Sequence, residues 1–461
     1  MSELAGTQSG ITTRLVSGAP QRATLSSRYK AYMLLLMALI AMLAHIDRYI
    51  LSILLVPIQQ DLGASDTAMG LLGGLAFIAF YALAAVPVGR YADRGNRRNL
   101  LAVAVAVWST ATALCGAATQ FVHLLLARIG VAAGESAANP ASMSMIADMY
   151  PENRRATAIA FILVGTGVGI TLGSFLAGVI NDAFGWRTAF VIMGLPGVVL
   201  AAVIWLTFPE PVRGTYDSEA TRGKVDEDSK TIGRTLRYLF TIPTFPALVV
   251  GKSLLQISFQ AWLLWLPTFL IRVHEMTPSE MGLWFGLSSG GGAIVASLIG
   301  GPASDWLARN GKRWYLLFCA GAAAVGVPLS LAVLTVESTY VAVAMMLVYA
   351  ILAGTVTAPS VAAGLAIVRP RMRAFMSVVS FICINLVGAG LGPLIIGAIS
   401  DALKPVYGEE AIRYAMLIVP VAMVLCSIAF LWGSRTIERD ARTAMMLDEE
   451  DAAEDGTLDQ R

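Results

Sequence analysis

The sequence carries unusually little charge. Only 14% of its 461 residues are charged, whereas soluble globular chains average about 25%. Hydrophobic residues make up 56% of the chain, and its mean hydropathy is +0.68. Because so few polar side chains are available to cover a water-facing surface, these values exclude a soluble protein. They indicate an all-α membrane protein, since a helix satisfies its own backbone hydrogen bonds within lipid.

Histidine and cysteine are also scarce, with three and four residues respectively. The histidines lie far apart in the chain, so we expect no metal site. The cysteines fall in apolar runs without close neighbours, which predicts buried free thiols: Cys115, Cys319, Cys383 and Cys426. The sequence shows no nucleophile–base pair and no phosphate-binding loop. We therefore expect neither an enzyme nor a bound cofactor.

The basic residues are distributed unevenly along the chain. Residues 1–29 are polar and include Arg14, Arg22 and Arg28, so a cleavable signal peptide is not indicated. Lysine and arginine otherwise gather on alternate loops, which sets orientation in a membrane and does not indicate nucleic acid binding. This pattern predicts cytoplasmic termini. The short outer loops and the lack of an Asn-x-Ser/Thr sequon favour a bacterial inner (plasma) membrane.

Twelve segments reach the length of about 20 mostly apolar residues that one membrane crossing needs. They lie at 30–56, 67–90, 98–119, 121–149, 154–182, 187–208, 243–272, 279–307, 313–335, 338–368, 373–402 and 410–434. The first six resemble the last six: Gly89 and Asp93 recur as Gly301 and Asp305 at an offset of 212. Five further pairs share an offset of 219, namely Pro140–Pro359, Pro151–Pro370, Gly173–Gly392, Gly178–Gly397 and Asp182–Asp401. Such a duplication predicts two six-helix halves with a substrate cavity between them.

The duplication divides the chain into five parts. We expect a cytoplasmic N-terminal tail (1–29), an N-terminal six-helix bundle (30–208), a cytoplasmic linker (209–242), a C-terminal six-helix bundle (243–435) and an acidic cytoplasmic tail (436–461). Residues 230–240 carry bases on one side and apolar side chains on the other, which favours an interfacial helix or an ordinary helical linker about equally. The acidic composition of the tail predicts disorder.

His45, Asp47 and Arg48 lie inside the first apolar segment. A charge near the centre of a bilayer costs roughly 2.5–3.5 kcal/mol on insertion scales, so such residues indicate a functional site. The alternative is that the charges only hold the helices together. Adjacent residues on a helix do not face each other, so each charge needs a partner on another helix.

The fourth apolar segment supplies such partners. Arg128, Glu135 and Asn139 share one helix face, because they are seven and four residues apart. A rise of about 1.5 Å per residue places Asp47 level with Arg128 and Glu135 deeper, near the midplane. Two carboxylates and two guanidinium groups are therefore expected to form a buried network.

The loop after the second segment, residues 89–98, is rich in arginine. An aspartate here can accept hydrogen bonds at a helix N-terminus, and the arginines can pair with carboxylates of adjacent helices. Such a latch would hold the cytoplasmic side closed in one state, whereas a plain positive-inside loop is the alternative. The residues of this candidate latch are Gly89, Asp93, Arg94, Arg97 and Asp305. The loop resembles the signature of the major facilitator superfamily, and the resemblance covers essentially the whole chain. It implies two pseudo-symmetric six-helix bundles.

Three stretches together resemble the spinster subfamily: residues 45–48, residues 134–140 with Glu135 and Pro140, and residues 151–155. The resemblance implies proton-coupled transport of an amphipathic anionic or zwitterionic substrate, such as a lysophospholipid or sphingoid phosphate, by alternating access. Its partners would be the proton, that substrate and membrane lipids. Symporters of small organic anions carry a similar Asp-Arg and Gly-Glu pattern. They are the alternative, together with a drug exporter of the same fold.

Arginine stays protonated in a protein, whereas a buried carboxylate can take up a proton. We therefore expect Asp47, and after it Glu135, to carry the proton, with Arg48 and Arg128 as fixed positive charges. Protonation of Asp47 would release an arginine to bind an anionic group. His45 and Asn139 are further candidates for charge pairing or substrate contact, and for His45 a packing role is favoured.

The second half has few charges within its apolar segments. Lys252 lies near the cytoplasmic end of its segment, where snorkelling to the membrane surface explains it. The other candidates for the cavity wall are uncharged polar and aromatic residues that serve equally well as contacts between helices: Gln256, Gln260, Trp265, Thr357 and Asn385.

Overall fold

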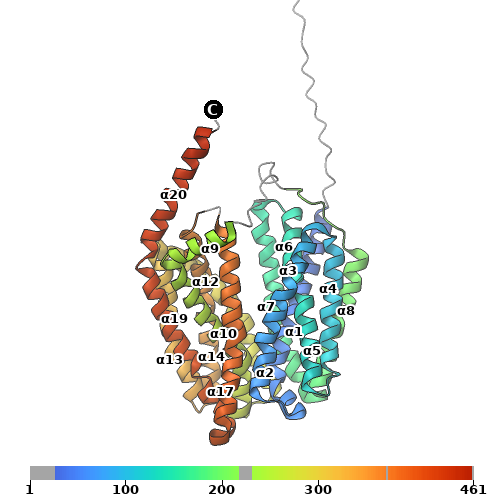
Figure 1. Ribbon diagram of the computed structural model, residues 1–461. Helices are drawn as coiled ribbons and strands as arrows, with labels where there is room; N and C mark the ends of the chain where they lie inside the picture. Colours follow the sequence, from blue (N-terminus) through green and yellow to red (C-terminus); the bar gives the residue numbers. More distant parts are fainter. Residues whose placement is uncertain (1–25, 217–230, 370–371, 459–461) are drawn as a thin grey trace, which may run out of the picture.

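The computed structural model describes residues 26–216, 231–369 and 372–458, apart from the side chains of Asp93, Ser297, Ala374 and residues 231–235 and 448–458. Helices form the first half of the chain, shown in blue to green in Figure 1. They are α1 (Ser27–Leu62), α2 (Asp66–Gly73), α3 (Leu75–Arg94), α4 (Arg97–Cys115), α5 (Phe121–Glu135), α6 (Ala138–Met149), α7 (Glu152–Phe184) and α8 (Trp186–Thr207).

The second half is a separate group of helices beside the first (Figure 1). It follows the linker helix α9 (Thr231–Thr241) and contains α10 (Thr244–Val273), α11 (Pro278–Gly286), the π-helix η1 (Leu287–Gly291), α12 (Gly292–Ala308), α13 (Arg313–Thr335), α14 (Thr339–Thr355) and α15 (Thr357–Ala366). The chain continues through α16 (Arg373–Cys383), the π-helix η3 (Ile384–Leu391), α17 (Gly392–Tyr407), the short 3₁₀ turn η4 (Gly408–Glu410), α18 (Ala411–Ala415), α19 (Ile418–Ser434) and α20 (Ile437–Leu458).

The described residues contain 11 apolar helical segments long enough to cross a membrane, of which the last spans residues 375–434. That last segment reverses direction at Gly408, whose φ of 57° lies in the left-handed region that glycine adopts most readily. It therefore crosses twice, once before and once after the turn. The predicted arrangement of two six-helix bundles is confirmed.

Close helix packing in the first half depends on glycine. A side chain at Gly165, Gly169 or Gly173 on α7 would collide with the backbone of α1. These positions are four residues apart and so share one face of α7. The stripe lets the two backbones approach closely, as small residues do in membrane bundles. It thereby fixes α1, which carries the charged residues.

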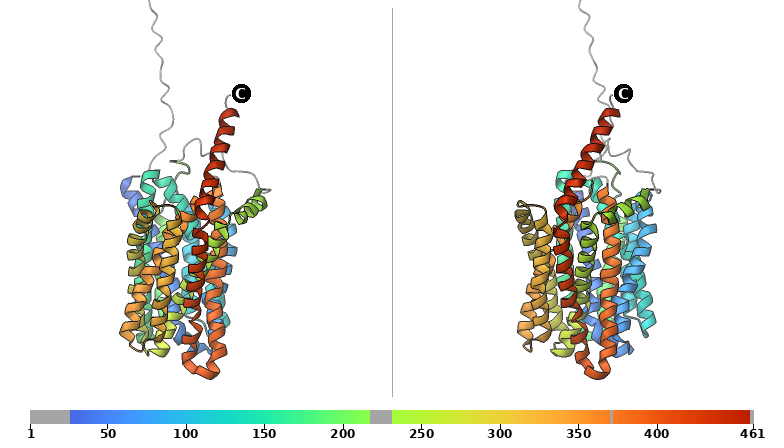
Figure 2. Two further views of the ribbon diagram at one scale, coloured as in Figure 1. Left: turned by 90° about the vertical axis from the view of Figure 1, so that its left-hand side faces the viewer. Right: turned by 60° about the vertical axis from the view of Figure 1, so that its left-hand side comes forward.

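We call the end of the bundle that carries α9 and α20 the linker face, and the end that carries α2 and α17 the far face (Figure 1). The acidic tail begins as helix α20, which extends away from the bundle at the linker face (Figure 2). Its first turns pack on the second half: Ile437 is fully buried, and the Asp440 carboxylate accepts from the Thr244 amide at 3.0 Å. The prediction of a disordered tail is wrong for this stretch because an apolar side at the start of α20 finds a partner.

The polar contacts between the two halves gather at the far face. Arg272 of α10 donates to both carboxylate oxygens of Asp66 on α2, at 2.8 and 3.0 Å, and to Gln59 of α1 at 2.6 Å. Ser400 of α17 donates to the same aspartate at 2.6 Å. Asp66 is 1% exposed, so this cluster closes the far face with a dry ion pair.

Two further contacts at the far face repeat each other. Asp401 of α17 accepts from the backbone amides of Asp66 and Thr67, at 2.9 and 2.8 Å, at the start of α2. Asp182 of α7 accepts from the backbone amide of Ser279 at 3.0 Å, at the start of α11. Thr67 and Ser279 are separated by the repeat offset of 212, and the aspartates by 219. Each half thus places one carboxylate on a helix N-terminus of the other half, where the helix dipole favours an anion. We call this pair of contacts the far-face clasp.

Candidate functional site

A cavity of about 440 Å³ lies between the two halves. Its wall comes from α1, α3, the end of α5, α6 and α7 of the first half and from α16 and η3 of the second, and most of it is apolar. The π-helix η3 contributes Asn385 and Leu386, and such irregular turns occur often at functional sites. The polar wall residues include His45, Arg48 and Glu135.

Glu135 owes its place to a break in the fourth crossing. Pro140 lacks an amide proton and its ring collides with the carbonyl four residues earlier, which favours a kink or a break at this point. Accordingly α5 ends at Glu135 and α6 begins at Ala138. The break places the Glu135 side chain on the cavity wall, where one carboxylate oxygen accepts from Arg48 Nε at 2.6 Å. Its other oxygen is buried and has no hydrogen-bond partner in the described part of the chain.

Two aromatic rings of α3 flank the arginines. The Arg48 guanidinium lies 5.6 Å from the centre of the Phe77 ring and 5.5 Å from that of Tyr81. The Arg128 guanidinium lies 5.1 Å from the Phe77 ring. Phe77 therefore sits between the two cations, and each contact is within the range of a cation–π attraction. These rings hold the arginines without neutralising them.

Asp47 and Arg128 lie behind the cavity wall. Both are buried, with 2% and 3% of their surface exposed. Arg128 Nη1 donates to the backbone oxygen of Asp47 at 2.8 Å, and within the described residues the Asp47 carboxylate forms no ion pair. The four predicted charges are thus brought together, and Arg48 has its partner, Glu135, on another helix as expected. The Asp47 carboxylate, which was expected to hold an arginine, pairs with neither Arg48 nor Arg128.

His45 and Asn139 both line the cavity. His45 Nδ1 is 2.8 Å from the Ala41 oxygen one turn earlier on α1, so one ring nitrogen is occupied within its own helix. The rest of the ring faces the cavity. The structure therefore places His45 next to any ligand in this cavity, beside the packing role that its sequence position favours.

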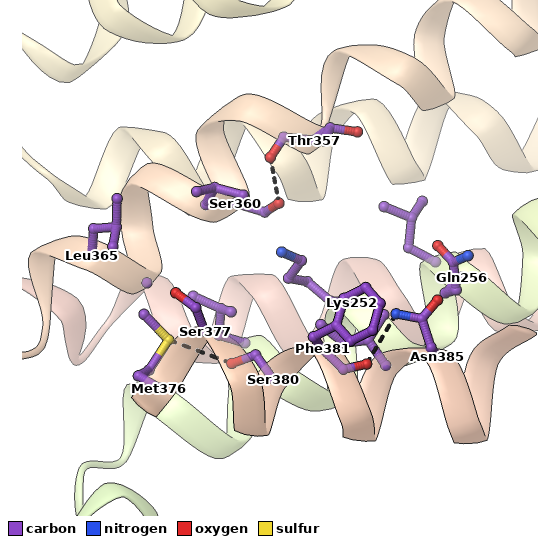
Figure 3. Close-up of a pocket in the computed structure, with 15 residues that line it drawn as sticks. Lys252, Gln256, Thr357, Ser360, Leu365, Met376, Ser377, Ser380, Phe381 and Asn385 are labelled. Carbon is purple, nitrogen blue, oxygen red and sulfur yellow. Dashed lines mark hydrogen bonds between the residues drawn. The ribbon is translucent and has the colours of Figure 1, made fainter. Parts of the chain in front are cut away.

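A second cavity, of about 400 Å³, lies within the second half and appears in close-up in Figure 3. Gln256, Thr357 and Asn385 line it, as expected for wall residues. Lys252 lines it too, whereas snorkelling was expected for this residue. Trp265 does not: it is fully buried and donates to the Pro393 oxygen at 2.8 Å, so its expected place on the wall is wrong. Gln260 lines neither cavity.

The arginine-rich loop at the linker face contains one deeply buried residue. Arg97 is 1% exposed, and it bonds to the carboxylates of Asp148 at 2.5 Å and Glu210 at 2.8 Å. Asp148 lies in the last turn of α6 and Glu210 follows α8, so both carboxylates belong to adjacent helices of the same half, as predicted for the arginines of this loop. Arg97 therefore ties the ends of α4, α6 and α8 together.

The other latch candidates are less engaged. Arg94 is exposed, and the Asp93 side chain lies outside the described set. A glycine at position 89 would allow another backbone to approach closely. In this conformation a side chain added at Gly89 would meet nothing within 4 Å, so no such approach is made. Asp305 accepts from Tyr315 of its own half at 3.4 Å. In the described residues, then, the candidate latch does not join the halves while the far face is closed.

Sequence reasoning missed the aromatic rings around the arginines and the bonding partners of Asp66. Phe77 and Tyr81 lie in an apolar run that contains many aromatic and aliphatic residues, so no pattern singles them out. Asp182 and Asp401 were found as a repeated pair, which was the one available signal for the far-face clasp. Their partners follow only from the way the two halves meet.

Residues 37–389 match the family model described as Major Facilitator Superfamily. An MFS-type efflux pump of Mycolicibacterium smegmatis is 32% identical over 406 residues, which cover 88% of this chain and 92% of that relative. A sphingosine-1-phosphate transporter of Danio rerio is 25% identical over 418 residues, covering 84% of this chain and 81% of the relative. A bacterial homolog of the human lysosomal transporter Spinster, solved in an inward-facing and occupied conformation, aligns at 28% identity with a TM-score of 0.77, over 90% of this chain and 99% of that one. The chain therefore belongs to the major facilitator superfamily and is a spinster-like membrane transporter, not an enzyme.

Proposed function

We propose that this protein is a proton-coupled transporter that moves an amphipathic anionic or zwitterionic lipid, of the lysophospholipid or sphingoid-phosphate kind, by alternating access. The observation that carries the proposal is the Arg48–Glu135 ion pair on the wall of the largely apolar cavity between the halves. A polar group that fixes one end of a ligand within an apolar wall suits a molecule with a charged head and a hydrocarbon tail.

Proton coupling follows from the chemistry of this ion pair. While Glu135 is ionised, its carboxylate occupies Arg48 Nε at 2.6 Å. When Glu135 takes up a proton, the hydrogen bond loses its charge on the acceptor side and weakens. Arg48 then becomes available to an anionic head group. Proton and anion thus favour each other's binding, as thermodynamic linkage requires.

Asp47 is the second proton site in this proposal. Its carboxylate is buried beside Arg128 and does not line the cavity. It therefore acts on the substrate through its neighbours, whereas Glu135 meets the substrate directly. For this reason we rank Glu135 ahead of Asp47 as the residue that couples the proton to the ligand.

Alternating access requires that the two faces open in turn. The far face is closed by the Asp66–Arg272 pair and the far-face clasp. We propose that the linker face is cytoplasmic, as the arginine-rich loops favour, and that this conformation is the inward-facing one. The loop residues Asp93, Arg94 and Arg97 would then secure the linker face when the far face opens.

The relatives support two readings of the substrate. The sphingosine-1-phosphate transporter supports an amphipathic lipid. The 32% identical efflux pump supports the second candidate, an exporter with the same fold. Both kinds of substrate suit an apolar cavity, but only a substrate with an anionic group would bind Arg48.

The test is transport by the full chain reconstituted in liposomes under an imposed pH gradient. The panel contains a labelled lysophospholipid, a labelled small carboxylate and a hydrophobic cationic dye. We expect gradient-dependent movement of the lysophospholipid. Movement of the carboxylate alone would replace the lipid with a small organic anion, and movement of the dye alone would identify an exporter.

A further inference from the structure

The second cavity has its own cation. Lys252 of α10 extends into it, together with hydroxyl and amide groups from α15, α16 and η3, as Figure 3 shows. The polar wall residues around it are Gln256, Thr357, Ser360, Ser377, Ser380 and Asn385. Ser360, Ser377 and Ser380 donate within their own helices. Lys252, with Gln256, Thr357 and the second amide proton of Asn385, forms the set of donors that suits a phosphate or a carboxylate.

Lys252 differs from Arg48 in its partners. None of the fifteen residues that line its cavity in the described structure is acidic. In contrast, the only other full cation on the wall of either described cavity, Arg48, is held by Glu135. While Glu135 is ionised, therefore, Lys252 is the cation on the cavity walls that an incoming anion meets without a competing carboxylate.

Snorkelling to the membrane surface does not account for this lysine. Lys252 is the ninth residue of α10, which begins at Thr244, so its Cα lies about 12 Å along the helix axis from that end. In Figure 3 its ammonium group lies between the helix with Thr357 and Ser360 and the helix with Phe381 and Asn385. It thus points across the cavity, among groups from other helices.

The tenth crossing has a one-residue interruption beside the cavity. Helix α14 ends at Thr355 and α15 begins at Thr357, which lines the cavity. Val356 between them keeps right-handed helical angles, so the interruption is slight. It precedes Pro359, just as the break at Glu135 precedes Pro140.

The two cavities adjoin, because Phe381 and Asn385 belong to the walls of both. We infer that, while Glu135 is ionised and holds Arg48, Lys252 anchors the anionic head group of the substrate, a phosphate or a carboxylate, in the cavity of the second half, with the hydrocarbon tail in the apolar cavity between the halves. Protonation of Glu135 then makes Arg48 available to the head group as a second site. The assignment of the tail rests on the proposed lipid function. The anion site itself stands on Lys252 and its neighbours.

The test measures equilibrium binding to the purified full-length protein. Three ligands separate head from tail: oleoyl lysophosphatidate has both, glycerol phosphate has the head alone, and mono-oleoylglycerol has the tail alone. We expect K252Q to weaken lysophosphatidate binding by roughly 10–100-fold, the usual worth of a hydrogen bond to a charged group, and to leave mono-oleoylglycerol unchanged. K252R, which keeps the charge, should retain most of the affinity. K312Q is the matched control, because Lys312 lies outside both cavities, with its Nζ 3.8 Å from Met445 Sδ.

Each result decides the inference. Lysophosphatidate binding that K252Q does not weaken overturns the site but leaves the lipid function intact. Glycerol phosphate binding that depends on Lys252, without binding of either lipid, supports the anion site and refutes the lipid function. Equal affinity of the unaltered protein for lysophosphatidate and mono-oleoylglycerol overturns the site without any substitution, as does the failure of both phosphates to bind. These two tests on the unaltered protein hold even if K252Q does not fold.

Discussion

Replacing Glu135 with glutamine tests the proposed coupling most directly. The variant keeps the shape of the side chain, and Arg48 can still donate to the amide oxygen. The hydrogen bond changes from one with a charged acceptor, worth about 1.5–3 kcal/mol, to one between a cation and a neutral group that is weaker by about 1–1.5 kcal/mol. The energy of a fully buried ion pair does not apply, because 38% of the Arg48 side chain is exposed to solvent screening. Arg48 is therefore easier to recruit by a factor of roughly ten.

Two measurements follow from this change. Lysophosphatidate binding is measured from mildly acidic to mildly alkaline pH, and uptake into liposomes is measured with and without a pH gradient. In the unaltered protein, affinity should rise as pH falls, because protonated Glu135 releases Arg48. In E135Q the affinity at alkaline pH should be about tenfold higher than in the unaltered protein. Gradient-driven accumulation should be lost while exchange of substrate across the membrane persists.

The matched control is E152Q, which removes an exposed carboxylate at the start of α7. It should keep the pH dependence of the unaltered protein, including the part that comes from titration of the ligand phosphate. If E135Q binds with the same pH dependence as E152Q and still accumulates substrate along a pH gradient, the proton does not act through Glu135. The coupling site would then move to Asp47, and D47N would be the next variant.

Two further predictions concern the two faces. D182N and D401N should each shift the protein toward forms with an open far face, since each removes a charge from a helix N-terminus, an effect of about 0.3–1 kcal/mol. The readout is labelling of cysteines introduced at the far face. Equal labelling with and without the substitution would contradict the role of the far-face clasp. R97Q should lower the free energy of unfolding by about 3–5 kcal/mol, because it leaves the carboxylates of Asp148 and Glu210 without their cation. Thermal unfolding in detergent measures the loss of stability. An unchanged melting temperature would show that water replaces the arginine between the two carboxylates.

The helical architecture follows from the sequence because lipid leaves the backbone few choices. Apolar length and the spacing of basic loops place every crossing to within a few residues, and the interruptions near Pro140 and Pro359 follow from the chemistry of proline. Helix periodicity and depth also bring His45, Asp47, Arg48 and Arg128 to one level. They place Glu135 deeper, although it contacts Arg48 at 2.6 Å.

The pairing within the site does not follow from the sequence. Which carboxylate reaches Arg48 depends on how α5 ends, and the difference between Asp47 and Glu135 is a matter of side-chain direction over a few ångströms. Lys252 illustrates the same limit: its place near one end of an apolar segment predicts snorkelling, and only the cavity between α10, α15 and α16 shows where its ammonium group points.

The far-face clasp has a consequence for how this protein came to be one chain. In a dimer with twofold symmetry, a residue that contacts a second residue across the interface is matched by the reverse contact, so every interaction occurs twice. Asp401 on the start of α2 and Asp182 on the start of α11 are such a pair, now made within a single chain. A six-helix ancestor could have closed its far face as a homodimer with one aspartate and one helix start. The two halves thus share the closure contact, whereas the charged residues of the candidate site, Asp47, Arg48, Arg128 and Glu135, belong to the first half.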